Sequence, residues 1–200
     1  FVDLIAPAVH EIVLNGRRLD PATAYLDSRI AIDDLAAENV IEVVADCAYV
    51  RTGEGLHRTV DPADGLVYLY SHFQVPDARR MYASFEQPDL KATWQLTVTA
   101  PDDWQVVSCA PAAEPVPAGP GRARWEFAPT PPISTYITAL VAGPYHVVRD
   151  SHTIGSQVIP LGVYCRASLA QYLDAEEIFE ITKRGFDFFT SPFDVPYPFG

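Results

Sequence analysis

The strongest constraint on the fold is an alternation of apolar and polar residues. It recurs, interrupted by turn signals, from residue 1 to about residue 148. Alternation with a period of two places one side of a strand in a core and the other side in solvent. Asn15-Gly16, which separates two such runs, is a strong signal for a two-residue hairpin. The predicted strands are several and short, which favours a mainly β domain built from more than one sheet.

The pattern changes near residue 150. One more strand, IPLGVYC at 159–165, precedes a segment in which apolar residues recur at helical spacing. We predict a helix from about residue 170 to residue 190 that stops at Ser191-Pro192. The sequence therefore predicts a β domain at 1–150 and the start of a second domain, a strand plus a helix, at 151–200. The first residues, FVDLIAPAVH, read as the middle of a strand, so we expect a piece of a longer protein.

Charge and cysteine content exclude several classes of function. Acidic residues outnumber basic ones by 26 to 14, and the formal net charge is −12. No basic cluster exceeds an Arg pair, so we expect neither nucleic acid nor a membrane as a partner. Cys47, Cys109 and Cys165 lie far apart, which fits neither a disulfide framework nor a zinc knuckle. We predict buried free thiols in a reducing cytoplasm.

Catalytic motifs are missing from the sequence. HEIVL at 10–14 begins like the zinc motif H-E-x-x-H, but Leu14 stands in place of the second histidine. The chain has no nucleophile elbow, phosphate loop or dinucleotide fingerprint. We therefore predict no catalytic residue and no metal ligand in this chain, and we expect it to bind no zinc by itself.

One polar segment is too long for the connection it makes. SHFQVPDARRMYASFEQPDLKA, at 71–92, lies between two predicted strands, where a hairpin needs only a few residues. We expect the Asp77 side chain to cap a short helical turn. We also expect Arg79 or Arg80 to pair with Glu86 or Asp89. The residues alone indicate a surface crossover.

This segment resembles the N-terminal domain of the zinc aminopeptidase N family. Those enzymes carry T-Q-F-E-P-x-x-A-R-x-x-F-P-C-F-D-E-P-x-x-K-A, and the present chain keeps the F…P…A-R…F-x-x-P…K-A frame with Val75 as an additional residue. PPISTYITALVAGPY resembles the family's T-P-x-M-S-T-Y-L-x-A-F strand. FDVPYPFG at the end resembles the family's F-x-x-P-Y-P approach to the catalytic core. An Arg-rich composition with many Ala and Pro residues favours an actinobacterial member of this family.

The resemblance implies a saddle-shaped, multi-sheet β domain followed by the start of an α+β thermolysin-like domain. It implies that the parent protein is a zinc metallo-aminopeptidase that removes N-terminal amino acids from peptides. The G-x-M-E-N segment and the zinc site would follow Gly200, in a catalytic domain that is missing here. This piece alone would then be inactive and would act as a scaffold and substrate-binding element.

The resemblance also assigns two substrate-binding residues. Gln74 stands at the family position that reaches into the active site and binds the substrate's free α-amine. Most members have Glu at this position, although the leukotriene hydrolase branch also has Gln. A neutral amide is a weaker acceptor for an ammonium than a carboxylate. His72 stands where the family has Gln, and a neutral histidine can also accept a hydrogen bond.

Two other functions remain open from the residues. The chain could be a non-catalytic β-sandwich module that binds carbohydrate or protein, or a purely structural scaffold. A carbohydrate-binding sheet would present exposed aromatic residues on one face. Trp94 instead shares its face of a predicted strand with Leu96 and Val98, which favours core packing.

Overall fold

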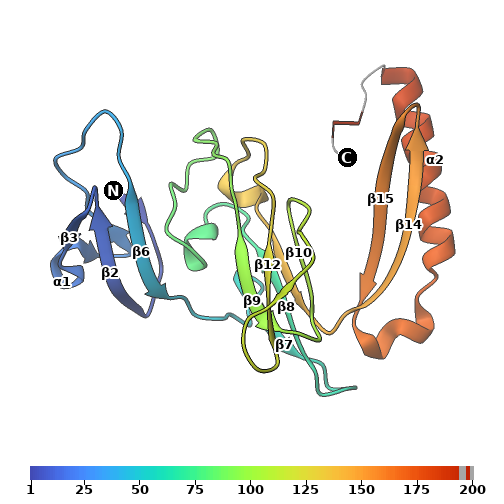
Figure 1. Cartoon of the computed structure of the whole chain (residues 1–200), viewed down its shortest axis with the longest axis horizontal. Coiled ribbons are helices and arrows are strands. Elements are labelled where there is room, and N and C mark those ends of the chain that lie inside the picture. The colour runs from blue at the N-terminus through green and yellow to red at the C-terminus, as the bar shows by residue number, and fades with distance from the viewer. Residues whose placement is uncertain (194–196, 199–200) are drawn as a thin grey trace. The chain divides into compact units, whose positions relative to one another are not determined.

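The computed structural model describes residues 1–193 and 197–198, which form two compact units. Unit 1 comprises residues 1–60 and 67–143, and unit 2 comprises residues 61–66 and 144–200. Strands dominate unit 1, as Figure 1 shows, and the prediction of a mainly β, multi-sheet fold is confirmed. The domain boundary at residue 150 stays a prediction. Much of the FDVPYPFG motif, residues 194–196 and 199–200, lies outside the described residues.

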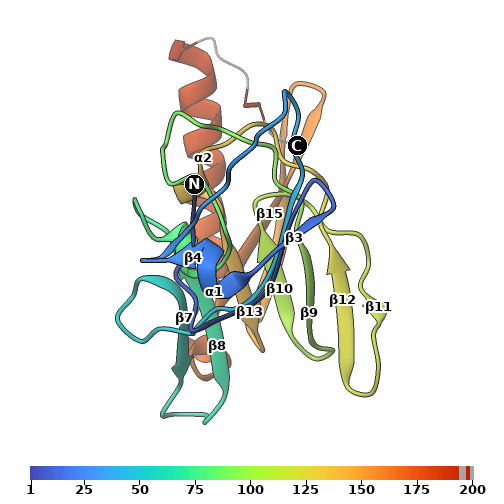
Figure 2. The ribbon, with the colours of Figure 1, turned by 90° about the vertical axis from the view of Figure 1, so that its left-hand side faces the viewer.

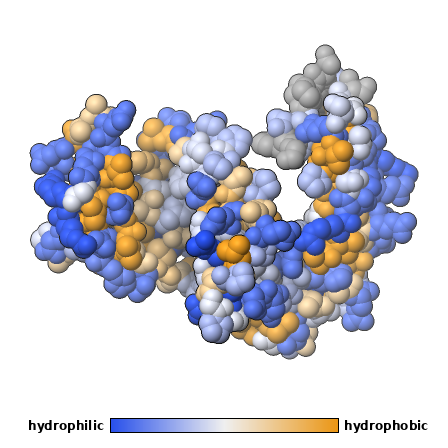
Figure 3. Space-filling model, in the orientation of Figure 1, coloured by the Kyte–Doolittle hydropathy of each residue, from blue (hydrophilic) through white to orange (hydrophobic). Residues whose placement is uncertain are grey.

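Unit 1 begins with two small antiparallel sheets, of order β3-β2-β6 and β1-β5-β4. Their elements are β1 (Val2–Asp3), β2 (Ala8–Leu14), β3 (Arg17–Leu19), α1 (Pro21–Ala24), β4 (Tyr25–Leu26), β5 (Arg29–Ile30) and β6 (Ile41–Asp46). Asn15 and Gly16 join β2 to β3 with φ angles of 53° and 78°, the left-handed conformations that the predicted hairpin requires. Ile12 and Ile30 are fully buried in the core. Val40 and Val44 remain exposed, and Figure 3 shows hydrophobic surface over the β3-β2-β6 sheet.

Two further antiparallel sheets complete unit 1, with the orders β10-β13-β8-β7 and β11-β12-β9. Their strands are β7 (Gly55–Val60), β8 (Val67–His72), β9 (Thr97–Pro101), β10 (Gln105–Ser108), β11 (Val116–Pro117), β12 (Arg122–Glu126) and β13 (Leu140–Gly143). Short 3-10 helices η1 (Ala78–Arg80) and η2 (Thr135–Ile137) lie in the connections. Leu69, Trp125 and Leu140 are buried in the shared core. Figure 2 shows β7 and β8 side by side, and β8 leads directly into the long polar segment.

Unit 2 contains one long hairpin and one long helix. Strands β14 (His146–Ile154) and β15 (Gln157–Cys165) pair along their whole length, and the 3-10 helix η3 (Ala167–Tyr172) and helix α2 (Ala175–Phe193) follow. The α-helix therefore begins later than residue 170, because Leu173 is extended and Asp174 accepts a hydrogen bond from the Glu177 amide at 3.2 Å. Pro192 lies within the last turn of α2, so the predicted stop at Ser191-Pro192 is slightly early.

Helix α2 carries two apolar faces. Phe179 lies on the face that packs on β14 and β15, and only 6% of it is exposed. A second set of apolar residues lies within about one third of the helix circumference and is exposed: Ile178, Ile181, Phe188 and Phe189. Two polar contacts join the packed face to the hairpin. Lys183 forms an ion pair with Asp150 at 2.6 Å, and the His152 ring is hydrogen-bonded to Asp187 at 2.8 Å.

A buried carboxylate fixes the turn at 61–66 within unit 2. The Asp61 side chain is 3% exposed; it accepts hydrogen bonds from the Ser168 hydroxyl at 2.6 Å and the Ala63 amide at 2.9 Å. The Arg166 guanidinium lies 3.2 Å away. The Ser168 hydroxyl, followed by the Ala63 amide and the charge of Arg166, holds the pKa of Asp61 below its ordinary value of 3.8.

The depressed pKa of Asp61 predicts a pH-dependent effect of Ser168→Ala. A carboxylate whose folded-state pKa is lowered contributes stability above its ordinary pKa of 3.8 and loses that contribution as the pH falls below it. Ser168→Ala should therefore lower the thermal midpoint at neutral pH, and the difference should vanish well below pH 3.8. Ser156→Ala, in the exposed hairpin turn, serves as the control. A Ser168→Ala effect that is equal at neutral and acidic pH would show that the hydroxyl does not act through the charge.

The cysteine environments differ from the predicted ones. All three thiols are free, but Cys109 is exposed and Cys47 and Cys165 are only partly buried, so the prediction of buried thiols is wrong. Each thiol lies at the end of a strand or directly after it, where the sheet covers less of the side chain. Among the helices of the described residues, none is both long and apolar enough to cross a membrane.

Candidate functional site

The candidate site begins where β8 ends. Tyr68 and Leu69 of β8 are buried, and the burial pattern continues through the end of the strand: His72 exposed, Phe73 2% exposed and Gln74 exposed. Phe73 packs edge-on against Tyr82, with ring centroids 5.9 Å apart. Because the residue between them is anchored in the core, both predicted site residues face away from it.

A contact with the Gly53 carbonyl defines the tautomer of neutral His72. The His72 Nδ1 atom lies 2.9 Å from the carbonyl oxygen of Gly53, which can only accept, so Nδ1 carries the hydrogen. In neutral His72 the Nε2 atom is therefore an acceptor. The Gly53 amide in turn donates to Nδ1 of His57 at 3.2 Å, and the His57 ring stacks on Tyr70 at 4.7 Å.

Gln74 begins a tight turn that continues through Asp77. Within the described part of the chain, no hydrogen-bond partner contacts its carboxamide. The Val75–Pro76 peptide bond is cis.

The predicted cap by Asp77 is wrong. Its side chain makes no capping bond to the backbone of η1. It instead accepts a hydrogen bond from Nε of Arg80 at 2.6 Å, since the nearby guanidinium is the stronger donor.

Glu86 joins two parts of the loop to η2. Its Oε1 accepts from the Arg79 amide at 2.6 Å and the Ser84 hydroxyl at 3.0 Å, and its Oε2 accepts from the Thr135 hydroxyl at 3.4 Å. The predicted pairing of Arg79 or Arg80 with Glu86 or Asp89 is therefore wrong for the side chains. The guanidinium of Arg80 pairs with Asp77 and, at 3.1 Å, with Glu54.

The N-terminal segment, which begins with strand β1, holds this loop through backbone hydrogen bonds. Asp3 and Ser84 exchange backbone hydrogen bonds of 2.8 and 2.9 Å, and the Ile5 amide donates to the Arg79 carbonyl at 2.7 Å. Sequence reasoning missed Asp3 and Ile5, because no local pattern links them to residues so far along the chain. The loop is therefore tethered to the N-terminal segment. His72 and Gln74, which lie where β8 leads into the loop, are exposed.

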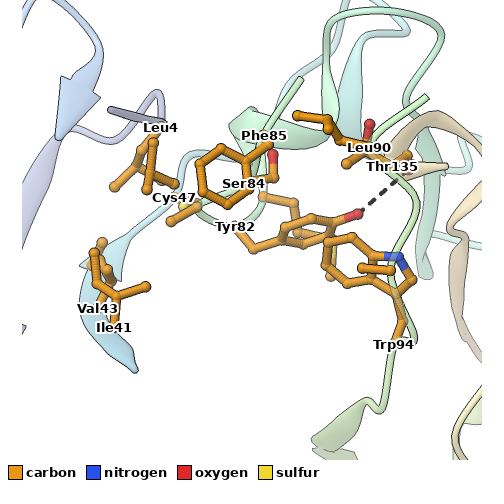
Figure 4. A pocket seen from close by; sticks show the side chains of 15 residues that line it. Leu4, Ile41, Val43, Cys47, Tyr82, Ser84, Phe85, Leu90, Trp94 and Thr135 are labelled. Atoms are coloured by element: carbon orange, nitrogen blue, oxygen red, sulfur yellow. Dashed lines mark hydrogen bonds between the residues drawn. The ribbon is translucent and has the colours of Figure 1, made fainter. Parts of the chain in front are cut away.

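An apolar cavity of about 440 Å³ lies behind the loop (Figure 4). Its polar groups already have partners: the Tyr82 hydroxyl contacts Thr138 and the Thr135 carbonyl, and the Trp94 indole donates to the Ile133 carbonyl at 3.3 Å. Burial raises the pKa of Tyr82 to about 12, so this hydroxyl remains protonated. The Tyr82 hydroxyl and the Trp94 indole are therefore already engaged within the protein.

The residues present do not fit a zinc centre. Within the described ranges, no three His, Cys, Asp or Glu side chains come close enough together to hold a metal ion. Four-coordinate zinc requires at least three protein ligands. A metal of the whole protein would therefore need ligands other than a cluster of the described residues.

Comparisons with known proteins agree on one family. Residues 54–137 match the family model for the peptidase M1 N-terminal domain. The chain is 57% identical over its whole length to aminopeptidase N of Streptomyces lividans, an actinobacterium, and spans 23% of that protein. It is 35% identical, over 98% of its length, to aminopeptidase N of Acetobacter pasteurianus and spans 59% of it.

A solved structure shares the fold. The crystal structure of Legionella pneumophila aminopeptidase A in complex with aspartic acid matches 99% of this chain and 23% of its own, with a TM-score of 0.83 and 18% identity. The chain therefore corresponds to less than two thirds of each of these proteins.

Proposed function

Because the chain belongs to the peptidase M1 family and carries its N-terminal domain, we propose that the whole protein is a zinc-dependent aminopeptidase. It would remove N-terminal amino acids from peptides in the cytoplasm. The observation that carries this proposal for the present chain is the tethered loop, whose exposed Gln74 has no partner among the described residues. This piece supplies a scaffold and part of the substrate site, and the catalytic domain follows it in the same polypeptide.

Gln74 and His72 would recognise the terminal amine of the peptide. The Oε1 atom of Gln74 accepts a hydrogen bond from the α-ammonium group, and the free Nε2 of neutral His72 can accept a second. An exopeptidase must distinguish a terminal ammonium from an internal amide, and acceptors at a fixed distance from the reacting bond achieve this. The contacts of Gly53 with His72 and the burial of Phe73 support this role, because they orient the two acceptors.

Zinc would be bound by residues of the catalytic domain. The described residues contain no cluster of His, Cys, Asp or Glu that could hold a metal ion. When bound, the metal would activate the water that attacks the peptide bond. The free cysteines fit a reducing compartment, which supports the cytoplasmic location as part of the proposal.

The three tryptophans give no support to the alternative, a non-catalytic β module that binds carbohydrate. Trp125 is buried, Trp104 packs against the core, and Trp94 is partly buried beside Tyr82. These three indoles therefore do not form an exposed aromatic face on one sheet.

The full-length protein should hydrolyse aminoacyl anilides that carry a free α-amine and should leave the N-acetylated forms intact. Chelator should abolish this activity, and added Zn²⁺ should restore it, because the proposed reaction needs the metal. The measurement is the rate of aniline release from matched free and acetylated substrates. Equal rates on the two substrates, or full activity in chelator, would contradict the proposal.

A further inference from the structure

We infer that Arg79 is a positioning residue for the amine site, acting on Gln74 through the turn that follows it. This inference rests on the proposed function. Arg79 would act without touching the substrate. Instead, its guanidinium fixes the part of the loop from which Gln74 projects.

The guanidinium of Arg79 joins the turn to a buried strand. Its Nε–H donates to the carbonyl oxygen of Pro76 at 2.9 Å, two residues after Gln74. Its Nη1 lies 3.8 Å from Oδ1 of Asp3. The side chain of Asp3 is 12% exposed and that of Arg79 is 26% exposed, so this contact is shielded from solvent. The turn is therefore attached to β1 by one planar group.

The backbone of Arg79 is held as firmly as its side chain. Its amide donates to Glu86 at 2.6 Å, and its carbonyl accepts from Ile5 at 2.7 Å. Because both polar groups of the Arg79 backbone are held, the starting point of its side chain is fixed. The guanidinium can therefore hold the Pro76 carbonyl, and with it the turn, in one position. Lysine could not replace it, because a single ammonium cannot contact the Pro76 carbonyl and Asp3 with the geometry of a guanidinium.

Arg29 provides a matched control. Its Nε lies 3.5 Å from the same Oδ1 of Asp3, but its side chain is 58% exposed and its guanidinium lies over the Phe1 ring. Arg29→Gln therefore removes a charge from beside Asp3 and leaves the Pro76 contact intact. Any effect that Arg79 exerts only by neutralising Asp3 should appear in Arg29→Gln as well.

A double-mutant cycle in the full-length protein tests the inference. The variants are Gln74→Ala, Arg79→Gln, both together and Arg29→Gln, assayed for kcat and KM on a free-amine anilide. Arg79→Gln should lower kcat/KM about three- to tenfold, mainly through KM, because misplacing one acceptor weakens a hydrogen bond to a charged donor. In the Gln74→Ala background the same change should have almost no further effect. Arg29→Gln should behave like the wild type.

The outcomes separate this inference from the proposed function. The positioning role would be overturned if the losses in kcat/KM of the two single variants add in the double variant, or if Arg79→Gln has wild-type kinetics. In either case a lower kcat/KM in Gln74→Ala would still support amine binding. A Gln74→Ala variant without any loss would overturn both. If Arg79→Gln fails to fold, Arg79→Lys completes the same cycle, since it keeps the charge near Asp3 and loses the second donor nitrogen. The Arg80 amide donates to the Asp77 carbonyl at 3.1 Å, and faster exchange of this amide in the folded variant would support the loosened turn.

Discussion

Replacing Gln74 by alanine in the full-length protein is expected to lower kcat/KM for free-amine substrates about ten- to hundredfold. The substitution removes one acceptor from a charged donor, which costs roughly 1.5–3 kcal/mol in a desolvated site, and each 1.4 kcal/mol corresponds to about a factor of ten. Stability should change by less than about 0.5 kcal/mol, because the side chain is exposed and has no partner among the described residues. The measurement is kcat/KM on a free-amine anilide, beside the thermal midpoint of each variant.

Gln74→Glu and Gln87→Ala complete this test. The glutamate should keep or increase activity, because a carboxylate makes a charge-assisted hydrogen bond to an ammonium. Gln87 is an exposed glutamine of the same loop, so Gln87→Ala should leave kcat/KM unchanged. If Gln74→Ala retains the full preference for a free amine over an acetylated one, Gln74 is a solvated loop residue and its assignment to the substrate is wrong.

Replacing Phe179 by alanine is expected to destabilise the packing of α2 on its hairpin by about 3–5 kcal/mol, which is the usual cost of truncating a buried phenylalanine. Only 6% of Phe179 is exposed, and it lies on the face that packs on β14 and β15. A loss of this size is comparable to the whole stability of a small unit, so α2 should detach locally. Amide hydrogen exchange along α2 in the 200-residue chain, with and without urea, measures the effect.

Phe188→Ala is the matched control on the same helix. Phe188 is 65% exposed, so its truncation should change the stability of the 200-residue chain by less than about 0.5 kcal/mol. Similar losses of protection in the two variants would show that both faces of α2 are covered in solution. That result would contradict the burial described for unit 2.

The sequence by itself determined the features that depend on neighbouring residues. Asn15-Gly16 predicted its hairpin because only residues that tolerate positive φ fit a two-residue turn. Alternation predicted a mainly β fold, because each strand exposes and buries successive side chains. The ordered match across 71–92 identified the family and placed Gln74 and His72 on the loop, although their roles stay predictions. These patterns extend over a few residues and can be read without knowing where the chain goes next.

Only the tertiary structure decided how the loop and the second unit are held. The side chain of Arg79 or Arg80 was expected to pair with Glu86 or Asp89. The Arg79 guanidinium instead contacts Asp3 and the Pro76 carbonyl, and it is the backbone amide of Arg79 that donates to Glu86. Asp61 lies in a turn, yet it is buried against Ser168, which lies 107 positions further along the chain. Charged side chains near the surface have several possible partners of similar energy. Which partner is chosen depends on the path of the whole backbone, and no local pattern in the sequence encodes that path.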